Sequence, residues 1–135
     1  MCDKSGVLIH NDTKVLLVHQ KISGLWSIPK GHSLPGENTG ECWKRELFEE
    51  TGLKYIPSGT VHRNKHRYNG YSITVIRIYT KNLPPVYPND DEIVTVKWVN
   101  IKDVGNYPLN SVTSKIIYEI LEKRVDCSSS PSPSP

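Results

Sequence analysis

The chain has 135 residues, of which 36% are hydrophobic and 23% charged, and its formal net charge is +3. This length predicts a single domain with its own core, residues 1–126, and a Ser/Pro-rich tail, 127–135, that is too polar to fold. Without a membrane-length apolar run, a signal-peptide pattern or paired cysteines, the sequence indicates a cytoplasmic protein with no membrane or DNA partner.

Short apolar runs predict the first strands of a sheet. Gly6–His10 and Val15–His19 flank the turn-forming residues Asn11–Thr13, which is the pattern of a β-hairpin. Trp26–Ile28 alternates as a short strand and stops at Pro29.

The stretch Gly31–Leu53, GHSLPGENTGECWKRELFEETGL, predicts a loop followed by a well-bounded helix. Asn38 is a favourable N-cap, and Glu41 three residues later completes a capping box. Gly52 is placed to take the left-handed conformation that ends a helix. The helix should therefore run from about Asn38 to about Thr51.

Three carboxylates share one face of this helix. Glu46, Glu49 and Glu50 lie three and four residues apart, a spacing at which like charges repel. A hard divalent cation would relieve that repulsion, because Mg²⁺ and Mn²⁺ prefer carboxylate oxygens. The alternative is a solvated acidic face without any ligand.

The second half of the chain predicts more strands and a final helix. Tyr55–Val61, Tyr71–Thr80 and Ile93–Val99 are rich in β-forming residues, and the proline-rich stretch 82–91 between the last two predicts a loop. From residue 110 to about 125, apolar residues follow helical spacing. Strands interspersed with two helices indicate an α/β fold, with a mixed sheet covered by helices.

The helical stretch also carries a complete family motif. Gly31 is followed after five residues by Glu37, then after seven by Arg45-Glu46, and the pattern GX5EX7REUXEEXGU, where U is bulky and aliphatic, is satisfied at every position. A chance match of one window is on the order of one in a billion at average residue usage. The chain therefore resembles the Nudix hydrolases, which implies an α/β/α sandwich and hydrolysis of a nucleoside diphosphate linked to another group.

The resemblance assigns roles to residues by position. It implies Mg²⁺ or Mn²⁺ as cofactor, with Glu49 and Glu50 as metal ligands and Glu46 as a further ligand or the general base. Catalysis would rest on Glu46 and Glu49, with Arg45 and Glu37 orienting the carboxylates, and which glutamate is the base is open. The family also implies two ligands from outside the helix, the backbone carbonyl of Lys30 and an acid among Asp90, Asp91 and Glu92, of which Glu92 is favoured.

The entry to the motif bears on the substrate. Pro29-Lys30-Gly31-His32 resembles dinucleoside polyphosphate hydrolases, and a PKG entry also occurs in mRNA decapping enzymes. Lys30 and His32 add positive charge near the acidic face, which suits a substrate rich in phosphates. The alternative reading of Lys30 is a solvent-facing lysine.

A basic stretch, His62–Tyr68, is the second indication of the substrate. It predicts a hairpin or loop in which Arg63, Lys65 and Arg67 hold a polyphosphate and Tyr68 or Tyr71 stacks on a base. A plain basic surface loop is the alternative.

Four functions are therefore in view. The leading one is hydrolysis of a small nucleotide such as a dinucleoside polyphosphate. The others are cleavage of the cap from capped RNA, hydrolysis of diphosphoinositol polyphosphates, and binding of a nucleotide without hydrolysis.

Overall fold

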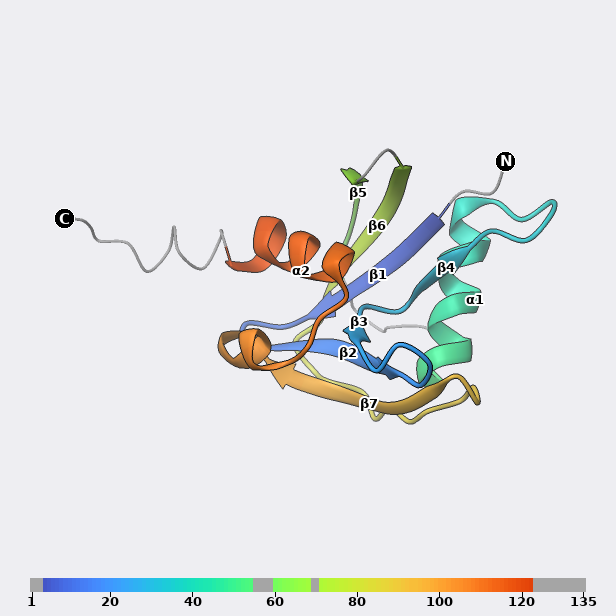
Figure 1. Cartoon of the computed structure of the whole chain (residues 1–135). Coiled ribbons are helices and arrows are strands. Elements are labelled where there is room, and N and C mark those ends of the chain that lie inside the picture. Colours follow the sequence, from blue (N-terminus) through green and yellow to red (C-terminus); the bar gives the residue numbers. More distant parts are fainter. Residues whose placement is uncertain (1–3, 55–59, 69–70, 123–135) are drawn as a thin grey trace.

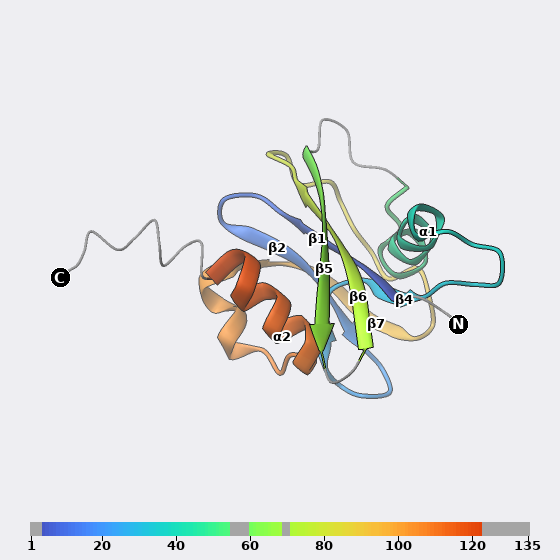
Figure 2. The same cartoon turned by 90° about the horizontal axis from the view of Figure 1, so that it is seen from above.

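The computed structural model of the chain describes residues 4–54, 60–68 and 71–122, and for 60–68 and Tyr71 the description covers the backbone. In these residues one mixed sheet lies between two helices (Figures 1 and 2). Its strands are β1 (Lys4–His10), β2 (Lys14–Gln20), β3 (Trp26–Ser27), β4 (Lys30–His32), β5 (Thr60–Tyr68), β6 (Tyr71–Tyr79) and β7 (Ile93–Asn100). The helices are α1 (Thr39–Thr51), the 3-10 helix η1 (Ile101–Asn106), α2 (Ser111–Ile117) and the π-helix η2 (Tyr118–Glu122).

The first hairpin organises the sheet. Between β1 and β2 the side chain of Asn11 accepts hydrogen bonds from the backbone N–H groups of Thr13 and Lys14, at 2.9 and 2.7 Å. The strand order is β3-β2-β1-β6-β5, while β4 pairs with β1 and β7 pairs with β2. The β1–β6 pair is parallel and the other pairs are antiparallel, so the predicted mixed sheet is confirmed.

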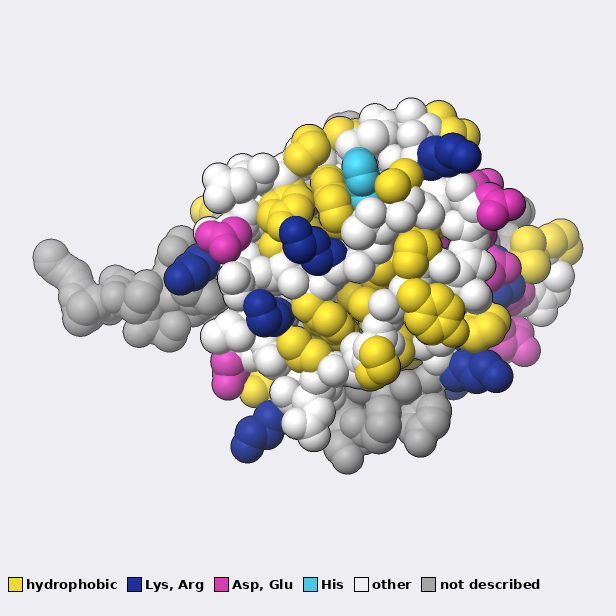
Figure 3. Space-filling model, turned by 90° about the horizontal axis from the view of Figure 1, so that it is seen from below, with side chains coloured by type: hydrophobic (Ala, Val, Ile, Leu, Met, Phe, Trp, Pro, Cys, Tyr) yellow, Lys and Arg dark blue, Asp and Glu magenta, His cyan; other side chains and the backbone are white. Residues whose placement is uncertain are grey.

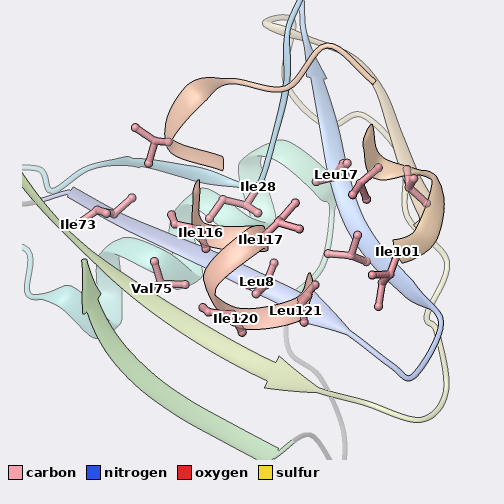
Figure 4. Packing of buried hydrophobic residues seen from close by; sticks show 14 residues of the cluster. Leu8, Leu17, Ile28, Ile73, Val75, Ile101, Ile116, Ile117, Ile120 and Leu121 are labelled. Atoms are coloured by element: carbon pink, nitrogen blue, oxygen red, sulfur yellow. The ribbon is translucent and has the colours of Figure 1, made fainter. Parts of the chain in front are cut away.

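Each face of the sheet carries its own apolar core. Successive side chains of β1 point to opposite faces, so Leu8 faces α2 while Val7 and Ile9 face α1. Figure 4 shows the α2 side, where Ile116 and Ile117 meet the strands. The smaller α1 cluster consists of Val7, Ile9, Leu16, Leu47, Leu53, Ile76 and Ile78. The α/β/α sandwich that the resemblance implied is therefore confirmed.

Several element boundaries differ from the sequence prediction. The strand β4 was not predicted, because three residues carry no periodicity and its partner lies at the start of the chain. The strand predicted from Tyr55 begins at Thr60, and residues 55–59 lie outside the described part. The final helix changes to π geometry at Tyr118, and the predicted tail falls beyond the last described residue. No helix in the described ranges is long and apolar enough to span a membrane.

Candidate active site

The start of α1 is fixed by its cap. The side chain of Asn38 accepts a hydrogen bond from the N–H of Glu41 at 2.8 Å, and the Glu41 carboxylate accepts one from the N–H of Asn38 at 3.0 Å. This is the predicted capping box. It holds the loop after β4 against the first turn of the helix.

The far end of α1 is closed by Gly52. This residue has φ +80°, the left-handed conformation predicted from the sequence, and its N–H bonds to the carbonyl of Phe48. A Cβ atom at position 52 would lie 2.6 Å from the ring of Tyr87. Position 52 therefore requires glycine for its backbone and for its contact. Between the two ends, Leu47 and Cys42 are buried and anchor α1 to the sheet.

Arg45 connects the loop to the acidic face of α1. Its guanidinium donates to both carboxylate oxygens of Glu37, at 2.7 and 3.0 Å, and to Glu49 at 3.0 Å. It also donates to the carbonyl of His32 in β4 at 2.9 Å. The hydrogen bond from Arg45 is the main reason that the pKa of Glu37 is lowered. Loop, strand and helix are thus held by one side chain.

Glu46 lies directly over the backbone of Gly31. A Cβ atom at position 31 would overlap the Glu46 carboxylate, whose farther oxygen would be only 2.8 Å away. The Glu46 side chain is 12% exposed, and burial raises its pKa. The motif glycine is therefore needed because it leaves room for a carboxylate.

Glu50 is the most buried of the three acids. Its Oε1 atom has no hydrogen-bond partner among the residues that the structure describes. Burial and, to a smaller extent, the negative charge of Glu46 raise the pKa of Glu50 to about 8. The backbone amide of Lys30 donates a hydrogen bond to the carboxyl, and this bond acts in the opposite direction by lowering the pKa. An unpaired buried oxygen is costly, and such atoms are uncommon in folded proteins.

Lys30 and His32 lie on β4, the strand that leads into the loop before α1. Burial lowers the pKa of Lys30, and the charge of Lys4 lowers it further. The carboxylates of Glu50 and Glu46 act on Lys30 in the opposite direction. Lys30 is therefore partly buried and interacts electrostatically with the α1 carboxylates, while its Cβ atom lies on the α2 face of the sheet, 3.3 Å from where a Cβ on Gly6 would lie. His32 is exposed and contributes its carbonyl to Arg45.

Of the three acids before β7, Asp90 is the one whose charge acts on Glu50, where it raises the pKa. Glu92 is exposed, its N–H donates to the Asp90 side chain at 2.9 Å, and its carbonyl accepts from Lys21. Among these acids the structure thus favours Asp90 as the one near the site. The sequence alone could not separate them, because the choice depends on how the loop before β7 folds.

These groups suit a hard cation in their chemistry. Carboxylate oxygens from α1, one of them buried and unpaired, are the ligands that Mg²⁺ and Mn²⁺ prefer. They are not gathered into one cluster of three or more ligands anywhere in the described ranges, and the ion pair with Arg45 engages Glu49. Figure 3 shows acidic and basic side chains interleaved along the edge where α1 lies.

The basic stretch forms a strand of a hairpin at the edge of the sheet. Its backbone register pairs Arg63 with Ile76, Lys65 with Thr74 and Arg67 with Ser72, and Tyr68 faces Tyr71 at the turn. The row of cross-strand partners that begins with Lys65 on β5 continues through β6 and β1 and ends at Gly31 on β4. The side chains of these predicted substrate-binding residues lie outside the described part.

Comparisons with known proteins agree with this geometry. The chain matches the family model of the NUDIX domain over residues 3–120. It is 29% identical over 104 residues to the phosphatase NudJ of Escherichia coli K12, which covers 72% of this chain and 67% of NudJ.

Solved structures share the fold. An Ap4A hydrolase of C. elegans superposes with a TM-score of 0.74 at 20% identity, over 91% of this chain and 98% of the other. A bifunctional NMN adenylyltransferase/ADP-ribose pyrophosphatase of Francisella tularensis gives 0.71 at 21% identity, over 90% and 40%. Enzymes with a NUDIX domain generally use divalent metal ions. Since the family model covers most of the chain and the motif is complete, the protein belongs to the Nudix family and is a pyrophosphohydrolase.

Proposed function

We propose that the protein hydrolyses a phosphoanhydride in a nucleoside diphosphate linked to another group, with a dinucleoside polyphosphate as the preferred substrate class. The observation that carries the proposal is the pair of buried carboxylates on α1. Glu46 lies over Gly31, and Glu50 has an unpaired oxygen beside the Lys30 backbone.

The carboxylates of Glu46, Glu49 and Glu50 would hold Mg²⁺ or Mn²⁺, with the carbonyl of Lys30 and an acid before β7 as further ligands. A divalent ion held there would supply neutralisation of phosphate charge and a more acidic attacking water. The carboxylate that is not coordinated at that moment, Glu46 or Glu49, would accept the proton of that water. The ion pairs of Arg45 with Glu37 and Glu49 would hold these two carboxylates in place during the reaction.

Two features support a phosphate-rich substrate. The first is Lys30, a partly buried cation whose charge interacts with those of Glu50 and Glu46. The second is the register of the edge strand β5. Cross-strand partners share a face of a sheet, and Ile76 belongs to the α1 cluster, so positions 63, 65 and 67 fall on the α1 face. Three cationic positions on the face of the carboxylates suit a long chain of phosphates.

The substrate is tested by following nucleotide and phosphate release with Mg²⁺ and with Mn²⁺. The panel holds diadenosine polyphosphates, capped RNA, free cap dinucleotide, diphosphoinositol polyphosphate, ADP-ribose and nucleoside triphosphates. We expect the highest kcat/KM for diadenosine polyphosphates. Turnover of capped RNA alone would instead make the protein a decapping enzyme, and nucleotide binding without turnover would overturn hydrolysis.

The role of β5 is tested by replacing Arg63, Lys65 and Arg67 together with glutamine. We expect KM to rise most for the substrates with the longest phosphate chains. The matched control replaces three exposed lysines from the region of the α2 cluster, Lys97, Lys102 and Lys115, which removes the same charge. An equal rise in KM in both triple variants would mean that only the net charge matters.

A further inference from the structure

A buried hydroxyl group lies beside the carboxylates and is used by nothing else in the described part of the chain. Ser5 on β1 is fully buried, and its Oγ atom has no hydrogen-bond partner among the described residues. Only one other buried side-chain oxygen in those residues is in the same condition, and that is Oε1 of Glu50 in the candidate active site. Burying an unpaired hydroxyl lowers stability, so its presence next to this site requires an explanation.

The sheet register places Ser5 next to Glu46. Ser5 and Gly31 are direct partners in the β1–β4 pair, so their Cβ directions share one face and lie about 4.5–5.5 Å apart. That face is the α1 face, because Val7 and Ile9 on the same side of β1 belong to the α1 cluster. The space where Gly31 would carry its Cβ is occupied by the Glu46 carboxylate.

We infer that Ser5 is a positioning residue of the metal site, whose hydroxyl donates a hydrogen bond to the Glu46 carboxylate when that carboxylate binds a divalent cation. Among the residues that the structure describes, the donor nearest the Glu46 carboxylate is Arg45, whose ion pair with it spans 3.4 Å, a long distance for a hydrogen bond. Arg45 is held by shorter bonds to Glu37 and Glu49. Glu46 therefore needs a second donor to keep its orientation, and the Ser5 hydroxyl is next to it.

The hydrogen bond would act through Glu46 and would not touch the substrate. Removal of a group that hydrogen-bonds to a metal ligand typically lowers metal affinity or activity by about 10- to 100-fold. The inference rests on the proposed metal site, although not on the identity of the substrate.

A small residue at position 5 could also serve only to let α1 approach the sheet. Ser5→Ala separates the two explanations, because alanine keeps the small size and removes the hydroxyl. Since the hydroxyl is unpaired in the metal-free fold, its loss should leave the free energy of unfolding unchanged or raise it. The same variant should bind metal more weakly.

The matched control is Ser27→Ala. Ser27 is also a fully buried serine on a strand, but its hydroxyl donates to the carbonyl of Ile28 at 3.0 Å. Its loss should lower the stability of the metal-free protein, because a hydrogen bond made within the fold is removed, and leave metal affinity unchanged.

The test uses the full chain. Free Mn²⁺ is counted by electron paramagnetic resonance during a titration without substrate, and urea unfolding is measured with the metal removed by a chelator. For Ser5→Ala we expect a Kd for Mn²⁺ raised about 10-fold or more, with unfolding free energy equal to or above that of the wild type. Ser5→Thr, which restores a hydroxyl, should recover part of the affinity.

Two results would overturn the inference. One is a wild-type Kd for Mn²⁺ in Ser5→Ala. The other is a loss of metal-free stability as large as that of Ser27→Ala, because the hydroxyl would then be paired within the fold. A wild type that binds Mn²⁺ but cleaves no dinucleoside polyphosphate would refute the proposed substrate and leave this inference standing.

Discussion

The carboxylate of Glu46 occupies the space that a side chain on Gly31 would fill. Strand β4 and helix α1 can lie this close only because position 31 has no Cβ atom. The relationship joins the first residue of the family motif to its acidic helix, and it explains in steric terms why that residue is glycine.

Gly31→Ala should therefore displace Glu46. A misplacement of about 1 Å in a catalytic constellation can lower turnover about 100-fold, and we expect a loss of at least that size in kcat. Gly105→Ala is the control, since no heavy atom would lie within 4 Å of its new Cβ. Steady-state kinetics with both variants checks this, and a Gly31→Ala enzyme with full activity would contradict the close contact.

Glu50 and Glu49 should respond differently when each is replaced with glutamine. Glu50→Gln replaces a buried carboxyl with an amide of similar shape, so the variant should fold with near-wild-type stability at neutral pH and lose turnover by orders of magnitude. Glu49→Gln should also lose turnover, and in addition it weakens the ion pair with Arg45 on a side chain that is 43% exposed. Urea unfolding and kinetics on both variants separate these effects, and retained activity in either would remove that residue from the ligand set.

The stability of the metal-free protein should fall as pH rises. Burial raises the pKa of Glu50 from its ordinary 4.5 to about 8, and it also raises the pKa of Glu46. Between about pH 5 and pH 8 the folded protein thus retains protons that the unfolded chain has released. The free energy of unfolding should decrease in this window, by at most about 1.4 kcal/mol per pH unit for each group.

Urea unfolding at several pH values, with a chelator present, measures this slope. Glu50→Gln should flatten it, because the amide has no proton to lose. An identical slope in the variant would mean that Glu50 is ionised throughout the window.

Replacing Arg45 with lysine should disconnect the loop from the helix. Lysine keeps the charge but lacks the planar fork that reaches Glu37, Glu49 and the carbonyl of His32 together. We expect kcat to fall about 10- to 100-fold, as for other residues that orient metal ligands. Stability should fall by about 1–2 kcal/mol as charge-assisted hydrogen bonds are lost.

The control for Arg45→Lys is Lys115→Ala, which removes an exposed ion pair with Glu119 on the opposite side of the sheet. That change should lower stability by only about 0.2–0.5 kcal/mol and leave kcat unchanged. Equal effects in the two variants would contradict a special role for Arg45.

What could be predicted from the sequence follows from how local each feature is. The capping box at Asn38 and the left-handed Gly52 depend on spacing within one stretch, and both are confirmed. The short strand β4 escaped prediction because its pairing partner lies about 25 residues earlier.

The burial of Glu50 and the proximity of Asp90 also could not be predicted. Both depend on how β4 and the loop before β7 pack around α1. The motif identifies which residues meet, whereas tertiary packing decides which of their atoms lose water.

The pairing of β1 with β4 has a practical consequence for protein engineering. Lys4, Ser5 and Gly6 are the partners of the strand that leads into the motif, so the first described residues of the chain support the strand that carries Gly31 into the candidate active site. A deletion that reaches residue 6 would leave most of both cores intact, yet it would release β4 and with it the alignment of Gly31. A shortened protein could therefore express well, remain folded and be inactive.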